Sequence, residues 1–133
     1  MISFELFSPS GSAPIYQQII MFIKRGIASG AIHDGDEMPS RRMLSALLGV
    51  NPNTAQKACR ILEEEGLISS SPGAKSFVTI DDGKITAIRG EVFESQISEL
   101  VTIMKQSGMT LDTCIETVTR LWDENNGRKD ESL

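Results

Sequence analysis

Hydrogen-bonding and cationic side chains gather between residues 40 and 57, ahead of a run of acids. Amide and hydroxyl groups can read the edges of DNA bases, while arginine and lysine attract both phosphate and guanine. The residues with this chemistry are Ser40, Arg41, Arg42, Asn51, Asn53, Thr54, Gln56 and Lys57. The acids Glu63, Glu64 and Glu65 follow them. A stretch that is polar and basic in front and acidic behind is suited to pointing its front end at a polyanion.

Two helices joined by a tight turn would position these side chains. The first is expected to begin at Ser40, which can cap it, and to stop at Gly49, which tolerates a positive φ. The second is expected after Asn51, with Pro52 in a first position where an N–H would be unpaired anyway. Its apolar face would consist of Ala55, Ala58, Cys59 and Leu62. The alternative to a DNA-reading helix is an ordinary amphipathic surface helix. Asn and Thr are also common at helix starts because they cap them, so their presence does not by itself indicate DNA binding.

A short β-hairpin is expected directly after these helices. Leu67 and Ile68 form one strand-like run, and residues 76–80 form a second with alternating polar and apolar side chains. Between them, residues 71–75 contain proline and glycine and predict a turn. Helix, turn, helix and hairpin together predict a winged helix-turn-helix.

Four successive motifs carry a family resemblance. PIYQQI, GDEMPSRRMLSALLGVNPNTAQKA, LEEEGLI and GAKSFV occur in this order between Pro14 and Val78. They resemble the motifs of the GntR family of bacterial transcription regulators, and the short remainder resembles the YtrA-type subfamily. The resemblance implies a winged-helix DNA-binding domain, a homodimer and a second domain that sets regulation. It also aligns Arg42 with the arginine of the family's Pro-Ser-x-Arg pattern, and places Arg41 at the variable position.

The expected wing departs from the family pattern at one residue. Many relatives have Gly-x-Gly before a hydroxyl residue and an aromatic, whereas this chain has Gly73-Ala74-Lys75-Ser76-Phe77. Lys75 therefore replaces the second glycine. Gly73 and Lys75 remain candidate DNA contacts, and the lysine is expected to reach a phosphate.

The charge of the chain is unevenly distributed. A formal net charge of −5 at first sight disfavours nucleic acid. Residues 14–78, however, hold seven basic and six acidic residues, while residues 79–133 hold six and eleven. A weakly basic reading domain implies modest non-specific affinity for DNA and reliance on dimerisation.

Several other classes of protein are disfavoured. Residues 1–5 lack the basic start and apolar run of a signal peptide, and no apolar stretch approaches the roughly 20 residues of a membrane span. With only two cysteines, Cys59 and Cys114, we expect buried thiols in a reducing cytoplasm and no membrane partner. One histidine, His33, does not make a metal site, and no cofactor is expected. An enzyme is disfavoured because no nucleophile with a base, paired carboxylates or phosphate loop is visible.

The N-terminal part is expected to support the reading helices. Alternating apolar residues predict a short strand over residues 2–6. Pro14 then opens a helix that Gly30 ends. The buried side of that helix is expected to carry Ile15, Ile19, Phe22, Ile23 and Ile27.

Two apolar stripes at helical spacing follow the wing, and Gly108 separates their helices. Thr110 or Asp112 could cap the second helix. The stripes are Phe93, Ile97, Leu100 and Met104, then Leu111, Ile115, Val118 and Trp122. A two-helix hairpin can bury one stripe inside itself, so the surplus must meet the winged domain or another subunit. The family resemblance favours a dimer interface, and the polar tail after Trp122 is expected to fray.

The expected fold is mostly α. Residues 1–80 would form an N-terminal winged helix-turn-helix with a small β-hairpin wing, and residues 81–133 a linker and a C-terminal two-helix hairpin for dimerisation. The expected function is a sequence-specific, homodimeric repressor whose recognition helix enters the major groove of a two-fold symmetric operator in double-stranded DNA. Two alternatives stay open: a regulator with a small-molecule effector site at the C-terminal helices, and a winged-helix module that binds protein.

Overall fold

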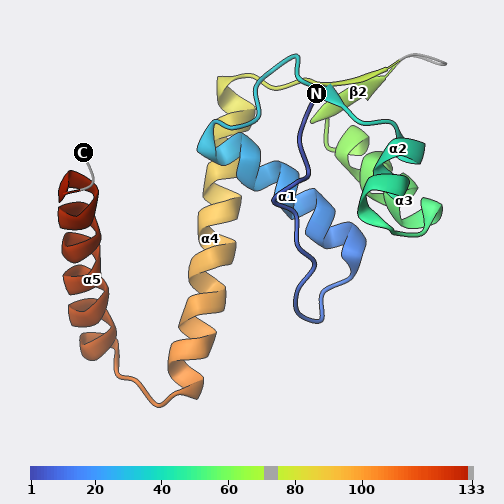
Figure 1. Cartoon of the computed structure of the whole chain (residues 1–133). Helices are drawn as coiled ribbons and strands as arrows, with labels where there is room; N and C mark the ends of the chain where they lie inside the picture. Colours follow the sequence, from blue (N-terminus) through green and yellow to red (C-terminus); the bar gives the residue numbers. More distant parts are fainter. Residues whose placement is uncertain (71–74, 132–133) are drawn as a thin grey trace. The chain divides into compact units, whose positions relative to one another are not determined.

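The computed structural model describes the backbone of residues 1–70 and 75–131, and the side chains of residues 1–70 and 75–125 (Figure 1). The chain divides into two compact units, Met1–Phe93 and Glu94–Leu133. Helix α1 (Ile15–Ser29), strand β1 (Glu37–Met38), helices α2 (Arg41–Leu48) and α3 (Pro52–Glu64), and strands β2 (Ile68–Ser70) and β3 (Ser76–Val78) lie in the first unit. Helix α4 (Asp82–Gln106) begins there, and α5 (Leu111–Glu131) lies in the second. The mostly α winged helix-turn-helix expected from the sequence is confirmed.

The core of the first unit forms between α1, α2, α3 and the start of α4. Helix α1 begins after Pro14 and ends at Gly30, which has a φ of 83°. Its buried face carries Ile19, Ile23 and Ile27, as the spacing predicts. These side chains join one cluster with residues of α2, α3, the strands and α4.

The two reading helices begin and end where the sequence predicts. Ser40 caps α2 by accepting a hydrogen bond from the Met43 N–H, and Asn51 caps α3 by accepting one from the Asn53 N–H. Pro52 occupies the first turn of α3, and Gly49 ends α2 with a φ of 65°. A residue with a Cβ atom would be strained at that φ, so glycine permits the tight turn between the helices.

The sheet has three strands rather than the expected two. Strands β2 and β3 pair antiparallel as the predicted hairpin, and β1 pairs antiparallel with the other edge of β3. The sequence analysis missed β1, because a two-residue strand is too short for an alternating pattern to show.

The predicted strand over residues 2–6 is wrong. The Ile2 N–H donates to the Glu37 carbonyl at 2.9 Å, but the segment then turns and makes no ladder. Ile2 and Phe4 are nevertheless buried, and the ring of Phe4 stacks on Phe22 of α1 with 5.1 Å between centroids. The alternating apolar residues therefore arise from burial of their side chains against α1 and not from pairing in a sheet.

Helix α4 contributes to the first unit through its first half. Ile88 and Val92 are buried in the core cluster. The Lys84 ammonium donates to the Gly66 carbonyl at 2.7 Å, and the Arg89 Nε donates to the Ala28 carbonyl at 3.0 Å. The first half of α4 is thus fixed to the winged fold by packing and by hydrogen bonds.

In the second unit, α5 begins where the hydroxyl of Thr110 accepts from the Thr113 N–H at 3.2 Å. Thr110 is therefore the cap, of the two residues considered. The backbone is helical to Glu131, and the expected fraying after Trp122 stays a prediction. Among the described residues, none of the helices has the length and apolarity that crossing a membrane requires.

Candidate nucleic-acid interface

A shallow open depression lies where the start of α2 meets the front of α3. Its volume is about 320 Å³, and it is lined by Arg41, Arg42, Ser45, Pro52, Asn53 and Gln56. Four of these residues belong to the predicted reading face, and they come from two helices. The fold therefore brings together two arginines and two amides that the turn separates in sequence.

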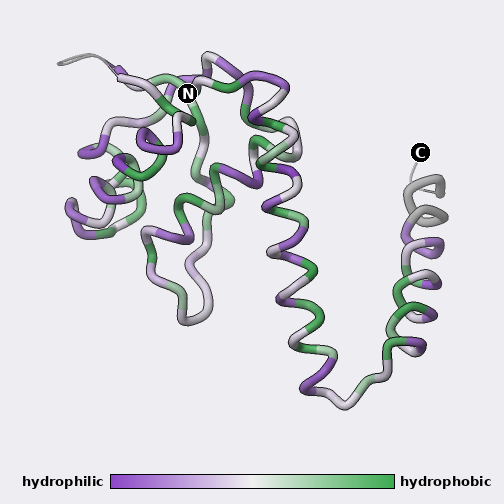
Figure 2. The backbone as a smooth tube through the Cα atoms, turned by 180° about the vertical axis from the view of Figure 1, so that it is seen from behind, coloured by the Kyte–Doolittle hydropathy of each residue, from purple (hydrophilic) through white to green (hydrophobic). Residues whose placement is uncertain are grey.

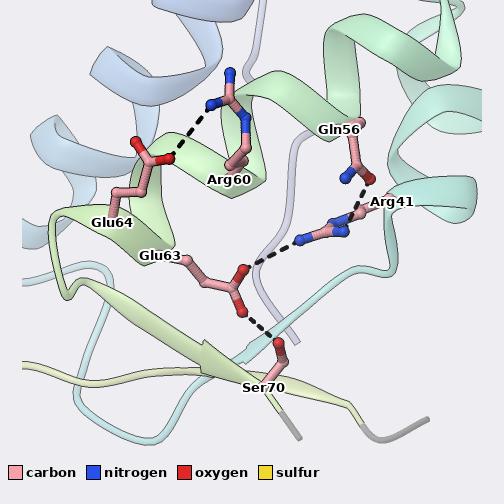
Figure 3. Close-up of polar contacts among 6 residues, drawn as sticks. All are labelled: Arg41, Gln56, Arg60, Glu63, Glu64 and Ser70. Carbon is pink, nitrogen blue, oxygen red and sulfur yellow. Dashed lines mark hydrogen bonds and ion pairs between the residues drawn. The ribbon is translucent and has the colours of Figure 1, made fainter. Parts of the chain in front are cut away.

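Arg41 is held at this site by two partners on α3 (Figure 3). Its Nη1 donates to Oε1 of Gln56 at 2.8 Å, and its Nη2 lies 3.1 Å from Oε2 of Glu63. The hydroxyl of Ser70, in strand β2, donates to Oε1 of the same carboxylate. This arrangement connects the first reading helix, the second reading helix and the wing strand.

Arg42 and Asn53 are exposed at the same depression. Among the described residues, the Arg42 guanidinium has no hydrogen-bond or ion-pair partner. Asn53 contributes its backbone N–H to the cap of α3 and keeps its amide at the surface. Both side chains can therefore reach an external partner without breaking a contact of the fold.

Ser40 and Asn51 have structural roles as helix caps. Their side-chain oxygens accept backbone N–H groups at 3.0 Å and 2.8 Å. A hydroxyl and an amide each keep a donor when their oxygen accepts. Each cap can therefore also donate a hydrogen bond to a phosphate.

Lys57 and Thr54 lie outside the lining of the depression. The Lys57 ammonium lies 4.0 Å from the centroid of the Tyr16 ring of α1, an attractive cation–π geometry. Thr54 is partly buried, and its backbone N–H bonds to Asn51 at the cap. The contacts of Lys57 place it on the α1 side of the reading helix.

The wing lysine has an acidic neighbour. Nζ of Lys75 lies 3.3 Å from Oε1 of Glu37 in β1, and 73% of the lysine side chain is exposed. An ion pair this exposed contributes little to stability, so Lys75 can leave Glu37 for another anion at little cost. Lys75 therefore remains accessible to a phosphate, while Gly73, the other predicted wing contact, lies outside the described residues.

Burial raises the pKa of the Cys59 thiol, and the positive charge of the nearby Arg41 partly opposes that rise. Cys59 is 3% exposed and Cys114 is 6% exposed, so both are buried thiols as expected. Within the described part of the chain, no cluster of His, Cys, Asp or Glu could hold a metal ion.

Three partners of the predicted residues were missed from the sequence. Glu63 contacts Arg41, the Ser70 hydroxyl donates to Glu63, and Glu37 pairs with Lys75. The sequence analysis placed Glu63 among the acids behind the reading residues and gave it no role in binding. No signal in the sequence pairs Arg41 with Glu63, because they lie on different helices and their contact depends on how α2 and α3 pack.

Comparison with known proteins identifies the family. The family described as "Bacterial regulatory proteins, gntR family" matches residues 15–78. The HTH-type transcriptional repressor YtrA of Bacillus subtilis (strain 168) is 31% identical over 126 residues, which cover 92% of this chain and 96% of YtrA. The chain belongs to the GntR family. This confirms the resemblance read from the motifs, and it makes the chain a DNA-binding transcription regulator.

Two further relatives show how the similarity is distributed. A GntR family transcriptional regulator from Listeria monocytogenes has a structure that matches with a TM-score of 0.71 and 29% identity, over 84% of this chain and 98% of that one. The HTH-type transcriptional regulator GgaR of Escherichia coli (strain K12) is 37% identical over 69 residues, or 52% of this chain but 28% of GgaR. The first similarity therefore spans most of both chains, and the second is confined to part of each.

Most residues of the two predicted interface stripes are exposed, and Met104 is half-buried. Ile97, Leu100, Ile115 and Val118 are 60%, 45%, 55% and 44% exposed, and Trp122 is 69% exposed. Figure 2 shows hydrophobic residues recurring along the second half of α4 and along α5. The two helices of residues 94–133 therefore do not bury these stripes against each other.

Proposed function

We propose that this GntR regulator is a sequence-specific, homodimeric repressor whose helix α3 enters the major groove of a two-fold symmetric operator. The observation that carries the proposal is the exposed face on which Arg41, Arg42, Asn53 and Gln56 surround one depression. Arginine pairs best with guanine and amides pair best with adenine when both their donor and acceptor are available. The similarity to YtrA, a protein named as a repressor, supports repression over activation.

Dimerisation is supported by the apolar side chains of residues 93–122. Side chains such as Ile97, Leu100, Ile115 and Trp122 are each about half exposed or more. Monomers rarely leave so much contiguous apolar surface in water, and such surfaces mark association sites. A second copy of the chain is the partner proposed here, since most soluble oligomers are two-fold symmetric dimers.

The geometry of a dimer sets the geometry of the operator. Two reading helices related by a two-fold axis enter successive major grooves when their half-site centres lie roughly 34–36 Å apart, or a multiple of that spacing. A weakly basic reading domain gains the affinity it needs by using two half-sites at once. Because operators lie in the bacterial cytoplasm, the proposal also places the protein there, in the reducing conditions that suit Cys59 and Cys114.

The experiment that tests the proposal selects bound sequences from a pool of random duplexes. The expected result is an enriched sequence with two inverted half-sites, bound by two chains per duplex in sedimentation. The variant Leu100→Glu/Val118→Glu is expected to be a folded monomer that binds the same half-site much more weakly. An enriched sequence without two-fold symmetry, or a wild-type chain that sediments as a monomer at micromolar concentration, would overturn the dimeric mechanism. The absence of any enriched sequence would overturn sequence-specific binding itself.

A further inference from the structure

We propose that Glu63 is a positioning residue for DNA recognition: it holds Arg41 in place, and through Arg41 it orients Gln56, so that this pair directs its donors at the base and selects guanine. The inference rests on the proposed function and adds which base this part of the face recognises. It assigns an effect on specificity to Glu63 and none to Glu64, its neighbour in α3.

The guanidinium of Arg41 contacts two side chains of α3. Nη2 lies 3.1 Å from Glu63 Oε2, and Nη1 lies 2.8 Å from Gln56 Oε1. A guanidinium has more N–H donors than these two contacts use, so Arg41 keeps donors for the DNA. Holding a long side chain in one geometry before binding removes the rotamer entropy that binding would otherwise cost. Arg41 therefore reaches the groove already oriented.

The same contact decides what Gln56 can recognise. Its amide oxygen faces Arg41, so its NH₂ group is directed elsewhere and offers donors. Reading adenine with both groups of the amide requires the oxygen to accept from the base, whereas guanine presents two acceptors, O6 and N7, in the major groove. Arg41 binds one lone pair of this oxygen and holds the oxygen toward itself, so the donors that Gln56 and Arg41 have left match an edge that only accepts. The adenine preference that the residue type suggests is replaced by a guanine preference.

The contacts of Glu63 stabilise this position of Arg41, and those of Glu64 do not. Ser70 of β2 donates to one oxygen of the Glu63 carboxylate and leaves the other for Arg41 (Figure 3). The Glu63 side chain is 30% exposed, so solvent weakens its ion pair less than at an open surface. Glu64 is 61% exposed and, among the described residues, pairs only with Arg60 of its own helix, at 3.3 Å. The two acids carry the same charge on the same helix, yet only Glu63 contacts the reading arginine.

This difference makes Glu63→Gln and Glu64→Gln a matched pair of variants. Each removes one negative charge, so both should strengthen binding to a scrambled duplex by a similar, small factor. On the duplex selected from a random pool, Glu64→Gln should keep the wild-type ratio of specific to scrambled affinity. Glu63→Gln should lower that ratio about tenfold, and the loss should map to a guanine that Arg41→Ala and Gln56→Ala also affect.

Two further variants keep the test interpretable. Ser70→Ala preserves every charge and removes the hydroxyl that orients the carboxylate, so it should give a smaller loss at the same guanine. In an Arg41→Ala background, Glu63→Gln and Glu64→Gln should behave alike, because the residue to be positioned is gone. Thermal melts of each variant identify any loss that comes from unfolding, and Ser70→Ala then carries the test if Glu63→Gln does not fold.

The outcomes separate this inference from the proposed function. If the wild type does not discriminate between selected and scrambled duplexes, the proposed function fails. If it does discriminate, but Glu63→Gln and Glu64→Gln raise affinity equally for both duplexes, Glu63 is only a repelling acid and the inference is overturned. A loss at adenine rather than guanine in Gln56→Ala would overturn the assigned orientation of the amide.

Discussion

Nζ of Lys24 lies 2.7 Å from Oε1 of Glu91, and this contact joins α1 to α4. The same ammonium lies 3.0 Å from Oε2 of Glu65, at the end of α3. Lys24 is 5% exposed, whereas the side chains of the two acids are 52% and 43% exposed. A buried cation thus holds three helices of the winged fold together through two carboxylates that remain partly in water.

Removing both carboxylates should cost more stability than removing the lysine. Glu65→Gln/Glu91→Gln leaves a buried ammonium without an anionic partner, and should lower the free energy of unfolding by about 2 to 4 kcal/mol. Lys24→Met leaves two carboxylates that water can solvate, and should stay within about 1 kcal/mol of wild type. Urea denaturation measures both. The control is Glu94→Gln/Glu99→Gln, which makes the same charge change at exposed positions of α4. If Glu65→Gln/Glu91→Gln is as stable as this control, the argument is refuted.

The same cluster predicts a loss of stability in alkali. Burial acts to lower the pKa of Lys24, but the hydrogen bonds and charges of Glu91 and Glu65 outweigh burial and raise the pKa above its ordinary value. Because the folded chain holds this proton more tightly, the contribution is fully present below the unfolded pKa of about 10.4 and is lost as pH rises through the folded pKa. The difference in unfolding free energy between wild type and Lys24→Met should therefore be flat at neutral pH and should shift against wild type above about pH 10.4. A difference that does not change with pH speaks against a raised pKa.

The cap of α3 allows stability and DNA binding to be tested separately. Asn51→Asp keeps an N-cap oxygen and adds a charge that the helix dipole favours, so stability should be kept or slightly raised. The same carboxylate at the front of α3 should repel phosphate and weaken binding to every duplex. Asn51→Ala should instead cost about 1 kcal/mol of stability. Gln106→Glu adds a comparable charge at an exposed position in the second unit and should leave binding nearly unchanged. Equal losses of affinity in Asn51→Asp and Gln106→Glu would mean that the front of α3 does not face DNA.

The wing lysine should act on phosphate without reading sequence. Lys75→Ala should weaken binding to all duplexes about equally and reduce the slope of log affinity against log salt by roughly one. Because Lys75 lies 3.3 Å from Glu37, Glu37→Gln should strengthen binding, and should do so less in a Lys75→Ala background. Affinities over a range of salt concentrations measure these effects. A loss confined to one base pair with an unchanged slope would show base reading instead.

The sequence predicts best where one residue acts on its immediate neighbours. Ser40 and Asn51 bond to backbone groups two or three residues away, and Gly49 acts through its own φ, so the starts and ends of α2 and α3 could be placed in advance. The strand-like runs on either side of residues 71–75 likewise predicted the pairing of β2 with β3.

Contacts between distant residues could not be predicted. Arg41 and Glu63 are separated by a helix, a turn and most of a second helix, and their pairing depends on the angle at which α2 and α3 pack. The segment over residues 2–6 failed for a related reason, since its apolar alternation fits burial against α1 as well as it fits a strand. The orientation of Gln56, and so its expected base, follows from the same long-range contact with Arg41.

The most direct test of the central claim, that the α2 and α3 face reads DNA sequence, is a binding titration of four proteins at one fixed salt concentration. Wild type, Arg42→Ala, Gln56→Ala and Glu64→Ala are each titrated onto the selected operator and onto a scrambled duplex of equal length. Arg42→Ala and Gln56→Ala should each lose about 1 to 3 kcal/mol on the operator and much less on the scrambled duplex, while Glu64→Ala should bind both as well as wild type or slightly better. If all three substitutions leave both affinities unchanged while the fold stays intact, this face is not the reader and the account is wrong.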